Sequence, residues 1–378
     1  MRIALISTCA VAVPPPAYGG TELIIAELAK MLPRLGHEVT VFATGDSKPE
    51  AALRYCFATP VWPPDEAAEL RHCVFAAEYI GSHPRAFDVV HAHQAQSLRL
   101  LAQQGVPLVA TIHHVRVAEL TEVYRRGSGV EYVAISRRQA ELSPELHARV
   151  VHHGLDPDLY PAGAGDGGYC AFLGRLAPEK APHLAIDAAR LAGIPLKIGG
   201  VAHAPDAAYF AQAVLPRLRR AGGSVQHLGQ VSHSPKVELL RRSRALLFPI
   251  RWEEPFGLVM IESMLVGTPV IGFAAGAAPE VIEEGVTGYL VRTVDEMADR
   301  LRQLDSFDRV RCRARARERW SSLRMARGYE DVYRAAMETR RAREISGIHD
   351  IEGVAVPAAA GRTGRRATSG GRRGRGDP

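Results

Sequence analysis

The stretch Arg251-Trp252-Glu253-Glu254-Pro255-Phe256-Gly257-Leu258-Val259-Met260-Ile261-Glu262 is the densest run of chemically informative residues in the 378-residue chain. The apolar run 245–248 leads into it and is typical of a buried strand. Pro255 and Gly257 break that strand, and the apolar pattern from 258 to 266 predicts a short helix that stops at Gly267. We therefore expect a strand, a glycine turn and a helix, in that order.

Two carboxylates flank this turn. Glu254 falls in the turn, and Glu262 falls about one turn inside the helix. The backbone N–H groups of 256–258 are expected to be unpaired and to carry a partial positive charge, which suits a hydroxyl-rich or anionic ligand. The alternative is that Glu254 is a solvated loop residue and that Glu262 has a structural partner, because an unpaired carboxylate is costly to bury.

The pattern around this stretch alternates strands with helices. Residues 2–6 predict a strand, Gly19 and Gly20 a loop before a helix over 22–35, and 37–42 a second strand, which together make a βαβ unit. The chain has neither a dinucleotide-binding GxGxxG nor a Walker loop. Gly19 and Gly20 at a helix N-terminus therefore indicate either an anion- or hydroxyl-binding loop or a turn that only needs small residues.

Several polar residues follow predicted strands of the first half of the chain. In open parallel sheets, ligands bind outside the carboxyl ends of the strands. The residues expected at that edge are His93, His113, Ser136 and His153. The histidine pairs raise the alternative of a metal site, but they have no carboxylate or cysteine at ligand spacing and form no HExxH, so we predict none. Asp156-Pro157-Asp158 is better explained as a capped turn than as a metal-binding pair.

A second motif is Gly174-Arg175-Leu176-Ala177-Pro178-Glu179-Lys180. A strand is expected to end at Gly174, Pro178 stiffens the turn, and a helix starts near 181. Arg175 and Lys180 can then reach one anion, since Arg grips phosphate through two parallel hydrogen bonds and Lys adds a point charge. The alternative is a pair of solvated surface cations.

Composition sets the class of the protein. The chain is 47% hydrophobic and 23% charged, and no apolar run approaches the ~20 residues of a membrane helix. Five scattered cysteines without a CxxC pair indicate a reducing compartment, so we expect a cytoplasmic location. Residues 1–13 could pass for a weak signal peptide, but a first buried strand is favoured. The Arg-rich end, 361–378, carries +5 of the net charge of +6, so the remainder is nearly neutral.

The two glutamates around Pro-Phe-Gly-Leu resemble the E-x7-E motif of the retaining glycosyltransferases of family 4, which have the GT-B fold. Residues 174–180 resemble the G-R-L-x-P-x-K-G motif of that family, with Ala181 in place of the last glycine. Thr111-Ile112-His113 resembles its T-x-H, and 276–280 its donor-side G-x-x-P-E. His153-Gly154-Leu155-Asp156 departs from the usual Asn-Gly-Ile-Asp. The resemblance covers roughly residues 1–340.

The resemblance implies an α/β protein with two facing Rossmann-like domains, each with a parallel sheet, and a cleft between them. On this basis we predict five segments. They are an acceptor-side domain over 1–160, a linker over 161–168, a nucleotide-sugar-binding domain over 169–320, a helix over 321–344 that crosses back to the first domain, and a disordered Gly/Arg-rich tail over 345–378.

It also implies a role for each candidate residue. Glu254 and the backbone of 256–258 would hold hydroxyls of the donor sugar, Glu262 the ribose, and Arg175 and Lys180 the diphosphate. His113 would contact the sugar near the transferring carbon, and the glycine pair would lie near the acceptor and the donor phosphates. The predicted catalytic residues are thus His113, Glu254, Arg175 and Lys180, and the predicted binding residues are Gly19, Gly20, Arg175, Lys180, Glu254, Phe256, Gly257, Leu258 and Glu262.

The predicted activity is metal-independent transfer of a hexose from an NDP-sugar to a hydroxyl acceptor, with retention of configuration and no cofactor. The acceptor would be a carbohydrate, a lipid or a small molecule. We expect no nucleic-acid partner, and at most weak peripheral contact with a membrane. The alternatives are a sugar-nucleotide epimerase on the same fold, a catalytically inactive sugar-nucleotide binder, and a nucleic-acid-binding protein that acts through its basic tail. The sequence names neither the acceptor, the sugar, the base nor the oligomeric state.

Overall fold

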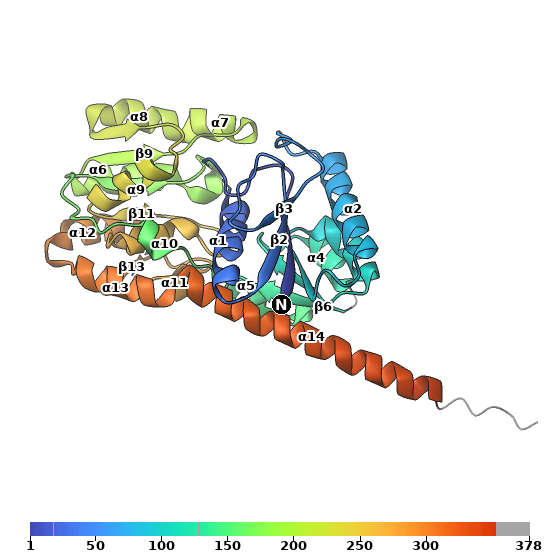
Figure 1. Cartoon of the computed structure of the whole chain (residues 1–378). Helices are drawn as coiled ribbons and strands as arrows, with labels where there is room; N and C mark the ends of the chain where they lie inside the picture. The colour runs from blue at the N-terminus through green and yellow to red at the C-terminus, as the bar shows by residue number, and fades with distance from the viewer. Residues whose placement is uncertain (18, 128, 353–378) are drawn as a thin grey trace, which may run out of the picture. The chain divides into compact units, whose positions relative to one another are not determined.

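The protein is described by a computed structural model that covers residues 1–17, 19–127 and 129–352. Residues 1–338 form one compact unit, and a second unit follows from residue 339. The first unit contains two separate sheets (Figure 1), and every pair of neighbouring strands in them is parallel. Parallel strands joined by helices define the α/β class, as the alternating sequence pattern predicted.

The seven-stranded sheet has the order β3-β2-β1-β4-β5-β6-β7. Its strands are β1 (Arg2–Ile6), β2 (Glu38–Phe42), β3 (Ala52–Arg54), β4 (Val89–Ala92), β5 (Leu108–Ile112), β6 (Val130–Ala134) and β7 (Arg149–Val150). Its helices are α1 (Gly20–Arg34), α2 (Glu66–Ser82), α3 (Leu98–Leu101), α4 (Ala118–Arg125) and α5 (Arg137–Leu142). We call residues 1–159 the N-terminal half.

The six-stranded sheet has the order β10-β9-β8-β11-β12-β13. Its strands are β8 (Cys170–Leu173), β9 (Leu196–Gly199), β10 (Val225–His227), β11 (Leu246–Phe248), β12 (Val270–Phe273) and β13 (Gly288–Val291). Its helices are α6 (Pro182–Ala192), α7 (Ala207–Tyr209), a π-helical turn (Phe210–Val214), α8 (Leu215–Ala221), α9 (His233–Arg242), α10 (Leu258–Leu265), α11 (Ala278–Val281), α12 (Val294–Arg302) and α13 (Arg309–Arg319). We call residues 160–320 the C-terminal half.

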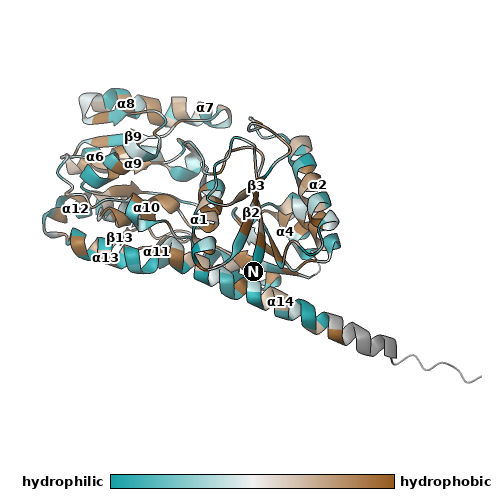
Figure 2. Ribbon diagram, in the orientation of Figure 1, coloured by the Kyte–Doolittle hydropathy of each residue, from teal (hydrophilic) through white to brown (hydrophobic). Residues whose placement is uncertain are grey.

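The central strands of both sheets are mostly hydrophobic (Figure 2), whereas the edge strands β7 and β10 include Arg149, Gln226 and His227. All four residues of β4, β8 and β12 are buried, as expected for strands covered by helices on both faces. In both sheets the strand order reverses direction beside the first strand, between β1 and β4 and between β8 and β11. Ligands of such sheets bind at this reversal, at the carboxyl ends of the strands.

The chain passes between the halves at two neighbouring places. Leu155 N–H donates to the Trp320 carbonyl at 2.9 Å, and Ser322 N–H donates to the Leu155 carbonyl at 2.9 Å. A Cβ atom on Gly154 would lie 2.3 Å from the Ser321 carbonyl oxygen, so only glycine allows this approach. After the second crossing, α14 (Ser322–Glu352) begins, and Tyr333 Oη lies 2.8 Å from His91 Nδ1 of the N-terminal half.

Two predicted boundaries differ from the structure. The last helix continues to Glu352, although we placed the start of a disordered tail at 345. This stretch contains Gly347, but a single helical glycine costs only about 1 kcal/mol relative to alanine, which flanking helix-forming residues can offset. The rest of that predicted tail, 353–378, lies outside the described residues. At the other end, α1 begins at Gly20 with Gly19 as its N-cap, two residues before the start of the helix predicted over 22–35.

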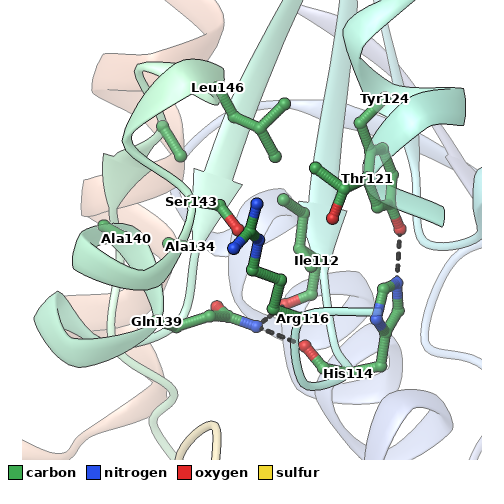
Figure 3. Close-up of a pocket in the computed structure, with 11 residues that line it drawn as sticks. Ile112, His114, Arg116, Thr121, Tyr124, Ala134, Gln139, Ala140, Ser143 and Leu146 are labelled. Carbon is green, nitrogen blue, oxygen red and sulfur yellow. Dashed lines mark hydrogen bonds between the residues drawn. The ribbon is translucent and has the colours of Figure 1, made fainter. Parts of the chain in front are cut away.

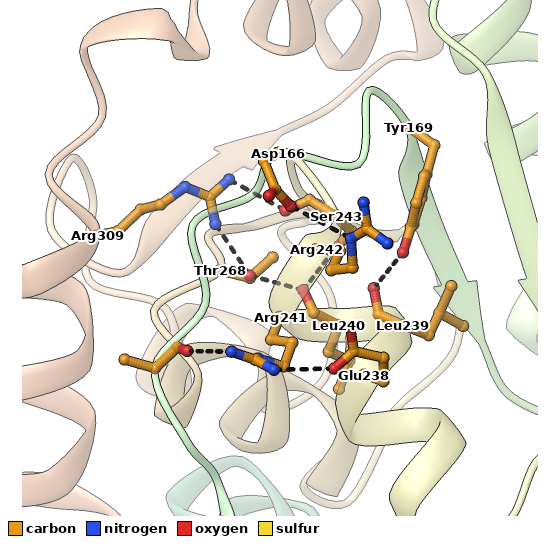
Figure 4. Close-up of polar contacts among 11 residues, drawn as sticks. Asp166, Tyr169, Glu238, Leu239, Leu240, Arg241, Arg242, Ser243, Thr268 and Arg309 are labelled. Atoms are coloured by element: carbon orange, nitrogen blue, oxygen red, sulfur yellow. Dashed lines mark hydrogen bonds and ion pairs between the residues drawn. The ribbon is translucent and has the colours of Figure 1, made fainter.

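The segment 161–168, predicted as a linker, runs along the end of α9, where Asp166 pairs with Arg242 (Figure 4). Gly163 N–H donates to the Val266 carbonyl at 2.8 Å, and Gly167 N–H donates to the Arg242 carbonyl at 2.8 Å. A Cβ atom on Gly163 would lie 2.1 Å from the Arg241 carbonyl oxygen. Here the glycines allow two backbones to approach closely, so their abundance does not indicate a free linker.

Within the described residues, no helix combines the length and the apolar character needed to cross a membrane. All five cysteines are free thiols.

Candidate active site

The turn before α10 has the geometry that its sequence predicts. β11 ends at Phe248, and Gly257 adopts a left-handed conformation (φ 85°) as the N-cap of α10. The loop that contains Gly276 (φ 53°) packs on this turn, and a Cβ atom there would lie 2.4 Å from the Glu254 nitrogen. Among the described residues, the N–H groups of 256–258 donate to no acceptor in the turn or the side chains around it. The turn therefore presents free amides.

The carboxylate of Glu254 is held by two donors. Lys180 Nζ forms an ion pair with its Oε2, and Trp252 Nε1–H donates to the same oxygen at 2.7 Å. The ammonium group of Lys180 also lies 4.9 Å from the centre of the Trp252 ring. The fold thus brings together two of the predicted catalytic residues, which lie 74 positions apart in the sequence.

Glu262 is buried, with only 3% of its surface exposed. Its Oε1 accepts a hydrogen bond from Tyr160 Oη at 3.1 Å and pairs with Lys236 Nζ. These partners satisfy the requirement that a buried carboxylate be hydrogen-bonded. They also fit the alternative prediction that Glu262 has a structural partner. Tyr160 and Lys236 stand in no motif with Glu262, and the sequence did not point to them.

Arg175 follows β8, and a 3₁₀ turn (Pro178–Lys180) separates it from α6. Its guanidinium pairs with Glu179, and its Nε lies 3.5 Å from Asp206 Oδ2. Arg175 and Lys180 are therefore on one loop, as predicted, but each is paired with a different carboxylate. An anionic ligand that binds both cations has to replace these internal partners.

The glycine loop of the N-terminal half lies against the turn of the C-terminal half. A Cβ atom on Gly20 would lie 3.5 Å from Leu258 Cδ1, at the start of α10. A Cβ atom on Gly19 would lie 3.0 Å from Oε2 of Glu22, whose Oε1 accepts from Thr8 Oγ1 at 2.7 Å. Burial raises the pKa of Glu22. The carboxyl group of Glu22, which sequence reasoning did not single out, therefore belongs to this edge of the site.

His113 follows β5 and is partly exposed. Its Nε2 lies 2.9 Å from Nδ1 of His93, which follows β4. Its ring stacks on that of His153, with centroids 5.4 Å apart, and the His153 ring meets Phe256 edge-on at 5.2 Å. His113 is thereby connected to the turn before α10. Burial lowers the pKa of His113 to about 3 and the pKa values of His93 and His153 well below the ordinary value.

The backbone on both sides of His113 is fixed by Gln139 of α5 (Figure 3). Gln139 Nε2–H donates to the carbonyl groups of Ile112 at 3.0 Å and His114 at 2.8 Å. A small pocket beside this contact is lined by residues of β5, α4 and α5, and His114 Nε2 lies 2.7 Å from Tyr124 Oη in its wall. The polar side chains that line this pocket thus hold the end of β5 in place.

Glu280 joins the two halves. We expected its segment on the donor side, and Gly276 does touch Glu254, but the carboxylate of Glu280 points to the N-terminal half. It accepts from the N–H groups of Arg137 at 3.0 Å and Arg138 at 3.2 Å, at the start of α5, and from His152 Nε2 at 2.9 Å. Burial acts to raise the pKa of Glu280, but these hydrogen bonds outweigh it and hold the pKa below its ordinary value.

In the part of the chain that the structure describes, no group of three or more His, Cys, Asp or Glu side chains is arranged to hold a metal ion. Asp156 instead accepts from the Asp158 N–H at 3.0 Å and pairs with Lys30 at 2.7 Å, in agreement with a capped turn.

Comparisons with known families cover most of this architecture. Residues 18–159 match the family described as Glycosyltransferase Family 4, and residues 164–319 match the one described as Glycosyl transferases group 1. Among curated proteins, the chain is 28% identical over 352 residues to the D-inositol 3-phosphate glycosyltransferase of Mycolicibacterium smegmatis, covering 75% of this chain and 79% of that protein. It is 29% identical over 344 residues to the Mycobacterium tuberculosis (strain H37Ra) protein of the same name, covering 76% and 71%.

Solved structures share the fold. A glycosyltransferase involved in avilamycin A biosynthesis, AviGT4, superposes with a TM-score of 0.70 at 24% identity, over 89% of this chain and 98% of that one. HepE of Anabaena, solved in complex with UDP and glucose, gives 0.68 at 20% identity, over 88% and 99%. Sucrose-phosphate synthase of Thermosynechococcus elongatus gives 0.73 at 18% identity, over 89% and 99%.

Two parallel Rossmann-like sheets, the glycine turn before α10 and these likenesses define a glycosyltransferase of the GT-B fold. The chain belongs to glycosyltransferase family 4. The fold class and the family predicted from the E-x7-E motif are thereby confirmed. The comparisons do not favour the epimerase or nucleic-acid-binding alternatives.

Proposed function

We propose that the enzyme transfers a hexose from an NDP-sugar to a hydroxyl acceptor, with retention of configuration and without a metal ion. The observation that carries this proposal is the turn before α10, where free amides lie beside Lys180, Glu254 and the glycine loop of the other half. A helix N-terminus next to an ammonium group suits a diphosphate. That HepE has been solved with UDP and with UDP-glucose supports a nucleotide-sugar donor here.

Donor binding exchanges the partners of the cations. The diphosphate becomes the partner of Arg175 and Lys180 in place of Glu179, Asp206 and Glu254. The carboxylate of Glu254 is then free to accept hydrogen bonds from a sugar hydroxyl. Glu262 uses Oε1 for both Tyr160 and Lys236, which leaves Oε2 for the ribose hydroxyls.

Catalysis then depends on stabilising charge. As the bond between the sugar and the diphosphate breaks, the leaving group gains negative charge, which Arg175, Lys180 and the amides of the turn stabilise. The acceptor oxygen forms its bond on the face from which the diphosphate leaves, and the acceptor proton passes to a diphosphate oxygen. No cofactor and no enzyme nucleophile take part. A cytoplasmic location and weak peripheral membrane contact stay predictions.

The test compares Glu254→Gln with Glu262→Gln. Glu254→Gln removes a charged acceptor for a sugar hydroxyl, a hydrogen bond of ~1.5–3 kcal/mol, so the rate should fall roughly tenfold to a hundredfold while free NDP still binds. Glu262→Gln should weaken NDP itself. Calorimetry with NDP and initial rates with a panel of NDP-sugars measure both effects. Identical behaviour of the two variants, or loss of NDP binding in Glu254→Gln alone, would contradict this donor orientation.

A further inference from the structure

The buried ring of His93 is hydrogen-bonded to the ring of His113, and this bond determines which nitrogens carry protons. His93 follows β4 and His113 follows β5, and these neighbouring parallel strands bring the two rings together. His93 Nδ1 and His113 Nε2 lie 2.9 Å apart, a hydrogen-bond distance. One of these nitrogens must donate and the other must accept. The direction of the bond therefore fixes which nitrogen of each ring carries the proton.

Both rings are neutral, since burial lowers the pKa of each far below neutrality. A neutral imidazole has one N–H and one bare nitrogen. If His93 donates, His113 carries its proton on Nδ1. If His113 donates, its Nδ1 is bare and His93 carries its proton on Nε2. Nδ1 of His113 is thus a hydrogen-bond donor in the first arrangement and an acceptor in the second.

The surroundings of His93 decide between them. Its Nε2 is buried and has no hydrogen-bond partner among the described residues. A proton there would be a donor without an acceptor. For backbone groups, orphaned buried N–H groups are rarer than under-satisfied carbonyl acceptors, and we apply the same preference to this ring nitrogen. The neighbouring His91 does not compete for the bond, because its nitrogens lie 2.8 Å from Tyr333 Oη and 2.7 Å from Thr111 Oγ1. Hence His93 Nδ1–H donates to His113.

We propose that His93 is a positioning residue that holds His113 in the tautomer protonated on Nδ1, so that His113 is a hydrogen-bond donor to the sugar nucleotide. The identity of that ligand rests on the proposed function, whereas the tautomer does not. Of the two ring nitrogens of His113, Nε2 bonds to His93, and no hydrogen bond to Nδ1 is found among the described residues. The ring stacks on His153, which in turn contacts Phe256 at the donor turn. A ring N–H that faces the anionic sugar nucleotide can donate a hydrogen bond to it, which is the favourable arrangement.

The first test reads the tautomer directly. Nitrogen-15 NMR of uniformly labelled enzyme distinguishes a protonated from a bare ring nitrogen, and comparison with a His113→Gln variant identifies the His113 signals. We expect a protonated Nδ1 and a bare Nε2 in the wild type without ligand. A protonated Nε2 would overturn the proposal. This measurement involves no substrate, so its failure is separate from a failure of the proposed function.

Variants of His93 test the consequence. His93→Leu removes the donor, so the His113 proton should redistribute between its nitrogens and kcat should fall roughly tenfold to a hundredfold, with a smaller change in KM. His93→Asn places an amide N–H near the position of Nδ1 and should recover most of that loss. His72→Leu removes another buried histidine, bonded to the Ser7 carbonyl, and controls for lost packing. It should leave the His113 signals in place. Equal activity of the Leu and Asn variants at position 93, with thermal melts showing both folded, would also overturn the proposal.

Discussion

At Ala181 the chain departs from the family motif, which has glycine there, and the structure shows the physical cost. Ala181 adopts a left-handed conformation (φ 49°) at the N-cap of α6. A residue with a Cβ atom is destabilised by roughly 1–2 kcal/mol in this region. We predict that Ala181→Gly raises the free energy of unfolding by up to about 1 kcal/mol, because part of the gain is offset by the greater backbone entropy of glycine in the unfolded chain.

The control is Ala192→Gly, at the other end of the same helix and in a right-handed conformation. It should lower stability by roughly 0.5–1 kcal/mol. Thermal or urea unfolding of both variants measures the difference. If both substitutions destabilise alike, backbone strain at Ala181 does not explain the result.

The two cations of that loop give the second prediction at this scale. Arg175→Ala and Lys180→Ala should each weaken NDP binding by roughly tenfold, the scale of a charge-assisted hydrogen bond, and their effects should be partly shared because both hold one diphosphate. Arg217→Ala is a matched control, since Arg217 pairs with Asp187 and belongs to no part of the site. NDP affinity is measured by calorimetry. If the folded double variant binds NDP as tightly as the wild type, the diphosphate does not bind this loop.

Local motifs pointed to Arg175, Lys180, Glu254 and His113, since each stands in a turn or at a strand end that the sequence marks. Their present partners could not be predicted, because the Lys180–Glu254 pair joins residues 74 positions apart. Lys236 and Tyr160 have no motif around them, and only the packing of α9 against α10 brings Lys236 to Glu262.

At the scale of elements, α5 is capped by a side chain from the other half. Glu280 accepts from the first amides of α5, and Glu253 forms two hydrogen bonds with Arg138 of the same helix, at 2.8 and 2.7 Å. No pattern in the sequence predicted α5, which has only six residues, and α4 and β3, of eight and three residues, were missed as well. The strands predicted over 2–6 and 37–42 and the helices predicted over 22–35 and 258–266 match β1, β2, α1 and α10 to within two residues.

The carboxylate of Glu280 predicts a pH dependence. Its pKa in the folded protein lies below the ordinary value of 4.5, so its contribution to stability is present above that value and is lost as the pH falls through the folded pKa. Glu280→Gln should lower the free energy of unfolding at pH 7 by about 1–3 kcal/mol, the cost of a lost charged acceptor for partly buried donors.

Urea unfolding of the wild type and Glu280→Gln between neutral and strongly acidic pH checks this prediction. The difference between them should shrink as the solution becomes more acidic. A constant difference over the whole range would mean that the charge of Glu280 contributes nothing to stability.

At the scale of the whole molecule, the alternation of strands and helices and the family motifs were enough to predict two Rossmann-like sheets. The sequence could not predict how the segment 161–168 runs, because glycine serves both flexible linkers and close backbone contacts. Only the position of Gly163 against Arg241 distinguishes the two cases.

A second prediction at this scale concerns metals. The donor site offers cations and amides to the diphosphate, and the described residues contain no arrangement able to hold a metal ion. We expect turnover with an NDP-sugar and an acceptor to be unchanged by EDTA. A loss of turnover in EDTA that a divalent ion restores would require a metal carried with the donor or held by other residues.

The paired crossings at 154–155 and 320–322 limit how the enzyme can change shape. Because the two passing segments are hydrogen-bonded to each other, sliding or separating the halves would break these bonds, whereas rotation about the line they define keeps them. We therefore expect any opening of the two halves to be a rotation about this line rather than a slide. Rotation that opens the site must also draw Glu280 away from α5, so each opening uncovers a carboxylate and two amides together.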